Sequence, residues 1–266
     1  MPERMDRGKR RQLLKEDQAF IGRPFAMDKG SIRAVQANTR HLALMLLDTK
    51  LKHRASRAAS FAAGILDATL AKKPEGAVAC SKGCYYCCKT YVSVTIPEIF
   101  RLADALRGKA EKTARVIKAA ADSAGIPQLE RETRRVVCPI LEDKACSEYA
   151  PRPLVCRAVL SKSLEACLRI FEDNSGEMVP FADNTTDIRG YVVIMMQAAL
   201  RLSGLPHVHY EMNQALALAL EDPDAEERWL AGDDLFAKVP VDGHDLARSA
   251  LSSMTDMLVD NIRPTL

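Results

Sequence analysis

Eight cysteines in the middle third of the chain constrain this fold more than any other feature. They are Cys80, Cys84, Cys87, Cys88, Cys138, Cys146, Cys156 and Cys167. The first four fall between positions 80 and 88, and loops of two or three residues between cysteines let thiolates converge on one ion at about 2.3 Å. We therefore expect all eight residues to act together as metal ligands.

The spacing of the front cysteines predicts their local geometry. Gly83 precedes Cys84, where a tight turn around a metal often needs the positive φ that glycine adopts freely. Cys87 and Cys88 are adjacent, and neighbouring side chains tend to point apart, so their use in one tetrahedral site would be strained. Either they bind two different metals, or one is a ligand while the other packs or reacts. Two sites that share eight thiolates and one cluster with spare cysteines both remain open.

Basic residues near the cysteines are expected to offset the negative charge of a thiolate centre and to lower the pKa of the thiols. The candidates are Lys82, Lys89, Arg152 and Arg157. The alternative is that they are ordinary surface cations.

The cellular compartment decides between metal ligands and disulfides. Residues 1–15 are charged and lack the apolar stretch of a signal peptide, and no segment approaches the roughly 20 apolar residues of a membrane span. We therefore expect a cytoplasmic protein without a membrane partner, where reducing conditions favour metal-binding or redox cysteines. Disulfides and inert buried thiols are the alternatives.

The charge balance argues against nucleic acid as a partner. Lys plus Arg number 38 and Asp plus Glu number 35, whereas phosphate binding usually requires a strongly basic surface. Hydrophobic residues make up 47% and aromatic residues only 5%, which favours helices over a β-sandwich. The expected partner is a metal ion, and a protein partner stays undefined.

These features predict a mostly α fold, a helical domain wrapped around an irregular cysteine-rich metal-binding centre with at most one or two short strands. A helical N-terminal segment is expected over residues 1–75, the cysteine-cluster metal-binding region over 76–175 and a helical C-terminal segment over 176–266. We expect the three to form one compact domain.

Periodicity and capping signals predict the elements around the cysteines. Residues 91–95 alternate apolar and polar and predict a short strand. Thr95 followed by Glu98 has the spacing of a capping box, so a helix should begin there. Its inward face should consist of Ile99, Leu102, Ala103 and Leu106. Further helices are predicted over residues 110–123, 164–171, 187–202, 206–220 and 245–262, with a strand as the alternative for 192–194.

Residues 137–156 contain three prolines and show no helical period. Irregular backbone of this kind is expected to fold around a metal. Cys138-Pro139 begins a stretch of the form Cys-Pro-Ile-Leu…Cys-x-x-Tyr…Arg-Pro-x-x-Cys-Arg, which follows a front group that ends in Cys87-Cys88. The characteristic residues of this stretch are Cys138, Pro139, Cys146, Tyr149, Arg152, Pro153, Cys156 and Arg157.

Together, the two motifs resemble the bacterial cysteine-cluster family (CxxCxxCC, YkgJ-like), whose members are described as zinc- or iron-chelating proteins. The resemblance covers about residues 80–167 and implies metal chelation. One departure is the front spacing, because three residues separate Cys80 from Cys84 where the family name has two.

Two enzyme classes share parts of this pattern. Flagellin lysine methylases carry a similar cysteine cluster and use S-adenosylmethionine, although the chain shows no glycine-rich strand–loop–helix for that cofactor. Cys80, Cys84 and Cys87 also have the spacing of the radical S-adenosylmethionine motif, which normally needs a barrel of alternating strands and helices. His207 and His209 are further candidate ligands, expected in a loop or at a helix start.

The predicted function is metal binding, with zinc or iron as the cofactor, the iron including a [4Fe–4S] cluster. The alternative is an iron–sulfur redox protein or an S-adenosylmethionine-dependent enzyme such as a protein lysine methylase. No catalytic residue and no residue that binds an organic cofactor is assigned, and enzymatic activity is left undecided.

Overall fold

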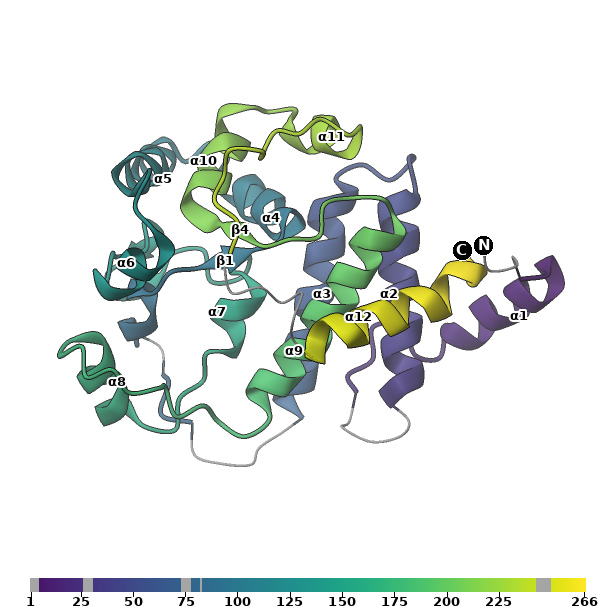
Figure 1. Cartoon of the computed structure of the whole chain (residues 1–266), viewed down its shortest axis with the longest axis horizontal. Helices are drawn as coiled ribbons and strands as arrows, with labels where there is room; N and C mark the ends of the chain where they lie inside the picture. Colours follow the sequence, from purple (N-terminus) through teal and green to yellow (C-terminus); the bar gives the residue numbers. More distant parts are fainter. Residues whose placement is uncertain (1–4, 26–30, 73–77, 82, 243–249) are drawn as a thin grey trace. The chain divides into compact units, whose positions relative to one another are not determined.

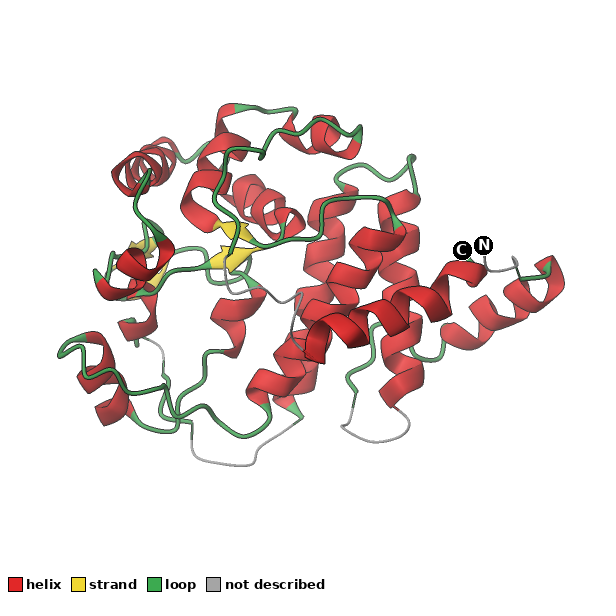
Figure 2. Cartoon of the chain, viewed as in Figure 1, coloured by secondary structure: helices red, strands yellow, loops and turns green. Residues whose placement is uncertain are grey.

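The secondary structure of the chain is mostly α-helical, which confirms the predicted fold class (Figures 1 and 2). The computed structural model describes residues 5–25, 31–72, 78–81, 83–242 and 250–266. None of the described helices is long and apolar enough to cross a membrane. The chain divides into two compact units, of which the first comprises Met1–Lys73, Asp187–His207 and His244–Leu266, and the second Pro74–Thr186 and Val208–Gly243.

The first unit is built from helices. It contains α1 (Arg7–Asp17), α2 (Ser31–Leu47), α3 (Arg54–Ala71), nearly all of α9 (Thr185–Leu202) and α12 (Ala250–Ile262). α2 packs against α3, whose buried face carries Ala55, Ala58, Ala59, Ala62 and Ala63. Small side chains at a helix contact allow a short distance between the axes.

The second unit holds all eight cysteines among shorter elements. Its helices are α4 (Ile96–Leu106), α5 (Ala110–Ser123), α6 (Gln128–Thr133), α7 (Leu154–Ala158), α8 (Leu164–Phe171), α10 (Met212–Glu221) and α11 (Ala225–Leu230), with the 3₁₀ turn η1 (Tyr86–Lys89). Two small antiparallel sheets are drawn in yellow in Figure 2. In them β1 (Ser93–Val94) pairs with β4 (Tyr210–Glu211), and β2 (Leu141–Glu142) pairs with β3 (Ala145–Cys146).

The predicted capping box starts α4. The carboxylate of Glu98 accepts hydrogen bonds from the amide of Thr95 at 3.0 Å and from its hydroxyl at 2.8 Å. The predicted inward face is fully buried, with Ile99, Leu102, Ala103 and Leu106 at most 1% exposed. The second carboxylate oxygen of Glu98 accepts from the amide of Leu154 at 2.8 Å, so the cap of α4 also holds the first residue of α7.

Other predicted boundaries differ from the structure. The helix expected over residues 206–220 begins only at Met212, because Tyr210 and Glu211 pair with β1 and Glu211 accepts the amide of Gln214 as the cap of α10. The strand alternative for 192–194 is wrong, since these residues lie inside α9. The helix predicted over 245–262 is described only from residue 250, and residues 243–249 lie outside the described part.

The β structure also bears on the radical S-adenosylmethionine alternative. Among the described residues the only sheets are the two small pairs, neither of which alternates strands with helices in a barrel. The barrel which that chemistry normally requires is therefore not formed by this part of the chain.

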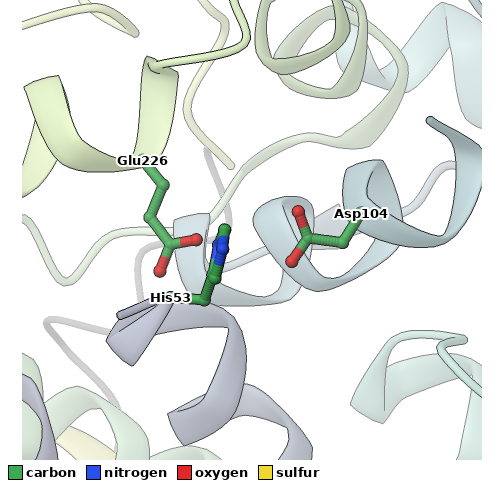
Figure 3. A group of neighbouring side chains, drawn as sticks. All are labelled: His53, Asp104 and Glu226. Atoms are coloured by element: carbon green, nitrogen blue, oxygen red, sulfur yellow. The ribbon is translucent and has the colours of Figure 1, made fainter. Parts of the chain in front are cut away.

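Two carboxylates approach each other in the second unit, apart from the cysteines. Asp104 on α4 and Glu226 on α11 each bring an oxygen to within 4.8 Å of the other (Figure 3). Asp104 also lies 3.6 Å from the guanidinium of Arg107. His53, drawn in the same figure, belongs to the first unit.

Candidate metal centre

The front cysteines lie on a loop that leads into η1. Gly83 has a φ of +91°, as its predicted turn requires, and a Cβ there would meet no atom within 4 Å. Glycine is therefore favoured by backbone conformation and not by lack of space. The amide of Cys84 donates to the carbonyl of Ser81 at 3.0 Å, and Cys87 and Cys88 follow at consecutive positions of η1.

The later cysteines are carried by a hairpin and a short helix. Asp143 and Lys144 have φ values of 45° and 61° and form the two-residue turn between β2 and β3, as in a type I′ hairpin. This turn places Cys146 on β3 opposite Leu141, while Cys138 precedes the hairpin and Cys156 lies in α7. The hairpin lies inside the region that the sequence predicts as irregular.

The two groups of cysteines meet at one cavity in the second unit. The amide of Cys138 donates to the carbonyl of Cys88 at 2.8 Å, which joins the two segments through their backbones. The cavity has a volume of about 570 Å³, and its wall includes Cys84, Cys87, Cys88, Cys138, Cys146 and Cys156. Residues up to 72 positions apart (156 minus 84) therefore share one cavity.

The sulfur atoms surround this cavity without closing on one point. All eight cysteines are free thiols, and no three of the sulfurs in the described structure lie within 4.8 Å of one another. Four thiolates bound to one zinc ion lie roughly 3.8 Å apart. Side-chain rotation is therefore needed to bring four of them onto an ion.

Cys80 and Cys167 lie beside Ser161 and are not part of the cavity wall. The sulfur of Cys80 accepts the amide of Ser161 at 3.2 Å, and the Cys167 thiol interacts with the Ser161 side chain. Cys167 is buried on α8, where it packs against Tyr86 and Cys87. The eight cysteines thus comprise six in the cavity wall and two next to Ser161.

Three of the cavity sulfurs accept a hydrogen bond from the amide two residues further along the chain. The donors are Tyr86 for Cys84, Ile140 for Cys138 and Glu148 for Cys146. An amide donor favours the thiolate over the thiol, and therefore lowers the pKa of the sulfur. Hydrogen bonds of this kind also tune metals that are bound by thiolates.

Burial has the opposite effect on the thiol pKa, because it favours the neutral thiol over the thiolate. It is the largest influence on six cysteines, whose thiol pKa values are raised: Cys80, Cys84, Cys138, Cys146, Cys156 and Cys167. For Cys138 the pKa rises to about 11. The pKa of Cys87 is raised first by its hydrogen bond with Cys88 and then by burial. These thiols therefore keep their protons at neutral pH unless a cation replaces them.

Arg152 is the predicted basic residue that lies in the cavity wall. Its guanidinium carbon lies 3.7 Å from the ring centroid of Tyr149, and its buried Nε has no hydrogen-bond partner in the described structure. Its charge lowers the pKa of Cys146, after the larger effects of burial and of the Glu148 amide. A negatively charged thiolate centre is the kind of partner that such a guanidinium lacks.

The other predicted basic residues have different partners. Lys89 pairs with Glu172 at 2.6 Å. Arg157 donates to the carbonyl of Arg152 at 2.9 Å and to that of Ala150, so it shapes the loop before α7. Lys82 lies outside the described residues.

Some residues around the cysteines have no signal in the sequence. Met212 reaches the cavity wall from α10 because its amide donates to the carbonyl of Val92 at 3.0 Å, beside the β1–β4 pair. Ser161 lies between Cys80 and Cys167 because its own bridge pairs it with Phe181. The candidate ligands His207 and His209 are not among the residues of the cavity wall.

The central segment of the chain is similar to one family of known proteins. Residues 79–176 match the model of the CxxCxxCC family, described as a "putative zinc- or iron-chelating domain". This segment contains all eight cysteines. No curated protein and no solved structure matches the chain.

Proposed function

We propose that this chain binds zinc or iron through cysteine thiolates at the shared cavity, since its residues 79–176 match the model of the CxxCxxCC family. The observation that carries the proposal is that six cysteines from two distant segments line one cavity. Amide donors support it at the sulfurs of Cys84, Cys138 and Cys146. Each donor stabilises negative charge on a sulfur whose burial would otherwise keep it neutral. A bound cation takes the place of the proton, so that the sulfur can be both buried and negatively charged.

The chemistry of the residues present fits such a metal. Sulfur donors select zinc, iron–sulfur clusters and other soft ions over magnesium or calcium. The unpaired Nε of Arg152 supplies positive charge on the same wall as six thiols. A bound metal would supply a cross-link between the loop before α4 and the segment from Cys138 to Cys156.

We expect Cys84→Ser and Cys146→Ser each to lose half or more of the bound metal and to lower the melting temperature. Cys84 belongs to the front loop and Cys146 to the hairpin, so the pair tests whether both segments supply ligands. The measurement is elemental analysis of protein purified anaerobically under reducing conditions.

Met178→Ser is the matched control for these variants. Met178 also carries sulfur and lies just beyond the end of the matched segment, but its side chain is 90% exposed. Its metal content should equal that of the wild type. Full metal content in both cysteine variants would remove the basis of the proposal.

Metal binding should release protons and strengthen as the pH rises. Burial raises the pKa of four cavity thiols, to about 11 for Cys138, so these metal-free sulfurs are protonated at pH 7; the four are Cys84, Cys138, Cys146 and Cys156. An ion held by four thiolates must displace about four protons. Titration with Zn²⁺ in weak buffer measures this release, and an affinity that does not change between about pH 6.5 and 8 would contradict thiolate ligation.

An iron–sulfur cluster is a second candidate for the same cavity. The specific observation is that the sulfurs surround a volume of about 570 Å³ and that no three of the described ones converge. A cluster spreads its ligands over several irons and so needs less side-chain rotation than one ion. Anaerobic protein that is brown and contains iron and sulfide supports the cluster, whereas colourless zinc protein supports the single ions.

Either form of the site requires reduced thiols. We therefore propose that the protein works in a reducing compartment such as the cytoplasm.

A further inference from the structure

The positive charge of the chain is concentrated in α1, the purple helix of Figure 1. Its 11 residues contain five cations and two acids, which gives a net charge of +3. The formal net charge of the whole chain is also +3, so the remaining residues are balanced overall. The near balance over the whole chain, which argues against a nucleic-acid partner when it is taken alone, therefore conceals one strongly basic helix.

Four of the five cations lie together on one side of α1. Arg7, Arg11 and Lys15 follow one another at intervals of four residues, so they form a row that is about 12 Å long. These three side chains are exposed, and Arg10 lies half-buried beside the row. All four border one shallow surface hollow. We call Arg7, Arg10, Arg11 and Lys15 the basic face of α1.

The two acids of α1 do not neutralise the basic face, because both are held by partners on α2. Glu16 pairs with Arg33 at 2.8 Å, and Asp17 forms a buried ion pair with Arg40. In the part of the chain that the structure describes, no acidic side chain forms an ion pair with a cation of the basic face. The positive charge of this face is therefore uncompensated.

The order of the charges along α1 is the reverse of the order that stabilises a helix. Cations occupy the first turn, which contains no acid, although the N-terminal end of a helix already carries partial positive charge. Arg7 with Arg11, and Arg11 with Lys15, are also like charges four residues apart, which repel each other. Asp6 caps this end by accepting the amide of Gly8 at 2.8 Å. A polyanion bound to the basic face would remove the remaining repulsion.

α1 is held in place by buried contacts with the rest of the first unit. Arg40, which pairs with Asp17, also donates from its Nε to the hydroxyl of Thr265 at 2.7 Å. Arg10 donates from its Nε to the carbonyl of Thr265 at 2.9 Å and keeps its other N–H groups for a ligand. The basic face is thus presented on a fixed backbone, which reduces the entropy lost on binding.

The side chains of the basic face select the class of partner. No large hydrophobic side chain within residues 5–25 is exposed. A protein interface usually has an apolar centre, and a helix that lies on a membrane needs an apolar face, so neither partner fits. Three of the four cations are arginines, whose forked N–H donors match the oxygens of a phosphate. A nucleic-acid duplex carries one phosphate charge per roughly 1.7 Å and can be bound without any apolar contact.

We propose that α1 binds the phosphate backbone of a nucleic-acid duplex through its basic face. The contact is independent of base sequence, because phosphates carry no information about the bases. It requires no ion at the cysteine cavity, since α1 belongs to the first unit and the cavity to the second.

The test measures binding of the full-length chain, purified anaerobically under reducing conditions, to a fluorescein-labelled duplex of two helical turns. DNA and RNA duplexes of the same sequence are titrated by fluorescence anisotropy at salt concentrations between about 50 and 200 mM. Four phosphate contacts predict a slope of about −3 to −4 for the logarithm of the association constant against the logarithm of salt concentration. Binding of either duplex with this slope supports the proposal, and the tighter of the two identifies the nucleic acid.

Charge variants locate the contact. Arg7→Gln combined with Arg11→Gln should weaken binding at about 100 mM salt by roughly tenfold or more and flatten the slope by about 2. Arg7→Lys combined with Arg11→Lys keeps both charges and should keep the slope. The matched control is Arg134→Gln combined with Arg228→Gln, which removes two exposed guanidinium groups that are already paired with acids. Its affinity should stay within about twofold of the wild type.

Three results would overturn the proposal. The first is equal weakening in the two glutamine double variants, which would mean that only the net charge of the chain attracts the duplex. The second needs no variant: the wild type binds neither duplex at about 50 mM salt, or binds with a slope flatter than about −1. The third is binding to vesicles that contain phosphatidylserine without binding to either duplex, which would assign the basic face to a membrane surface.

Discussion

Removing the metal with a chelator is expected to unfold the segment from Cys138 to Cys156 while α2 and α3 keep their structure. Between Cys138 and Cys156 the regular structure consists of two-residue strands and the start of a five-residue helix, which cannot bury a core of its own. Thiolate-bound zinc contributes on the order of 10 kcal/mol to folding in small domains, which is comparable with the whole stability of a typical protein. The helices of the first unit bury their own residues, such as Leu42 and Leu66.

Hydrogen exchange read by mass spectrometry measures this effect segment by segment. Amides in residues 138–156 should lose most of their protection after chelation and regain it when Zn²⁺ is added back under reducing conditions. Amides in α2 and α3 serve as the internal reference. Protection of residues 138–156 that is the same with and without metal would show that the thiols do not stabilise this segment through an ion.

Glu98→Ala is expected to destabilise the protein by about 4 kcal/mol, because hydrogen bonds to a buried charged acceptor contribute about 1.5–3 kcal/mol each and a helix cap about 1 kcal/mol. The carboxylate is 5% exposed and accepts three hydrogen bonds, two from Thr95 and one from the amide of Leu154. Its loss leaves three buried donors without an acceptor. Denaturant unfolding of the metal-loaded protein gives the free energy.

Glu165→Ala is the control for this variant. Glu165 is also a first-turn glutamate in the second unit, but its side chain is 83% exposed and its ion pair is with Arg169. A change within about 0.5 kcal/mol is expected there. Metal affinity should also fall in Glu98→Ala, since Leu154 begins the helix that carries Cys156. A loss below about 1 kcal/mol would mean that solvent or another residue replaces the carboxylate.

Signals that act over a few residues can be recognised in the amino-acid sequence itself. The capping box at Thr95 and Glu98 and the apolar face of α4 depend on contacts within one or two helical turns, and both occur as predicted. The helix over residues 110–123 depends on the same local preferences and matches α5. The turn at Gly83 follows from the conformational freedom of that residue alone.

Pairing between distant segments cannot be recognised in this way. Glu211 lies within a stretch that local preferences assign to a helix, yet it pairs with Ser93 on a separate strand. Met212 enters the cavity wall as a consequence of that pairing. No residue near position 211 carries a local signal for its partner, because strand pairing is decided by contacts that form only in the folded chain.

The cysteines show both kinds of information. Their number and their crowding between positions 80 and 88 identify a thiol-rich centre from the sequence alone, since closely spaced thiols can converge without long-range structure. Which distant cysteine approaches which front cysteine was decided only by the tertiary structure, through the Cys138–Cys88 backbone bond and the packing of α8 on η1. The physical reason is the sequence distance over which each property is decided. Whether a residue can be a ligand depends on its own side chain. Which cysteines lie together depends on how segments up to about 80 positions apart pack against one another.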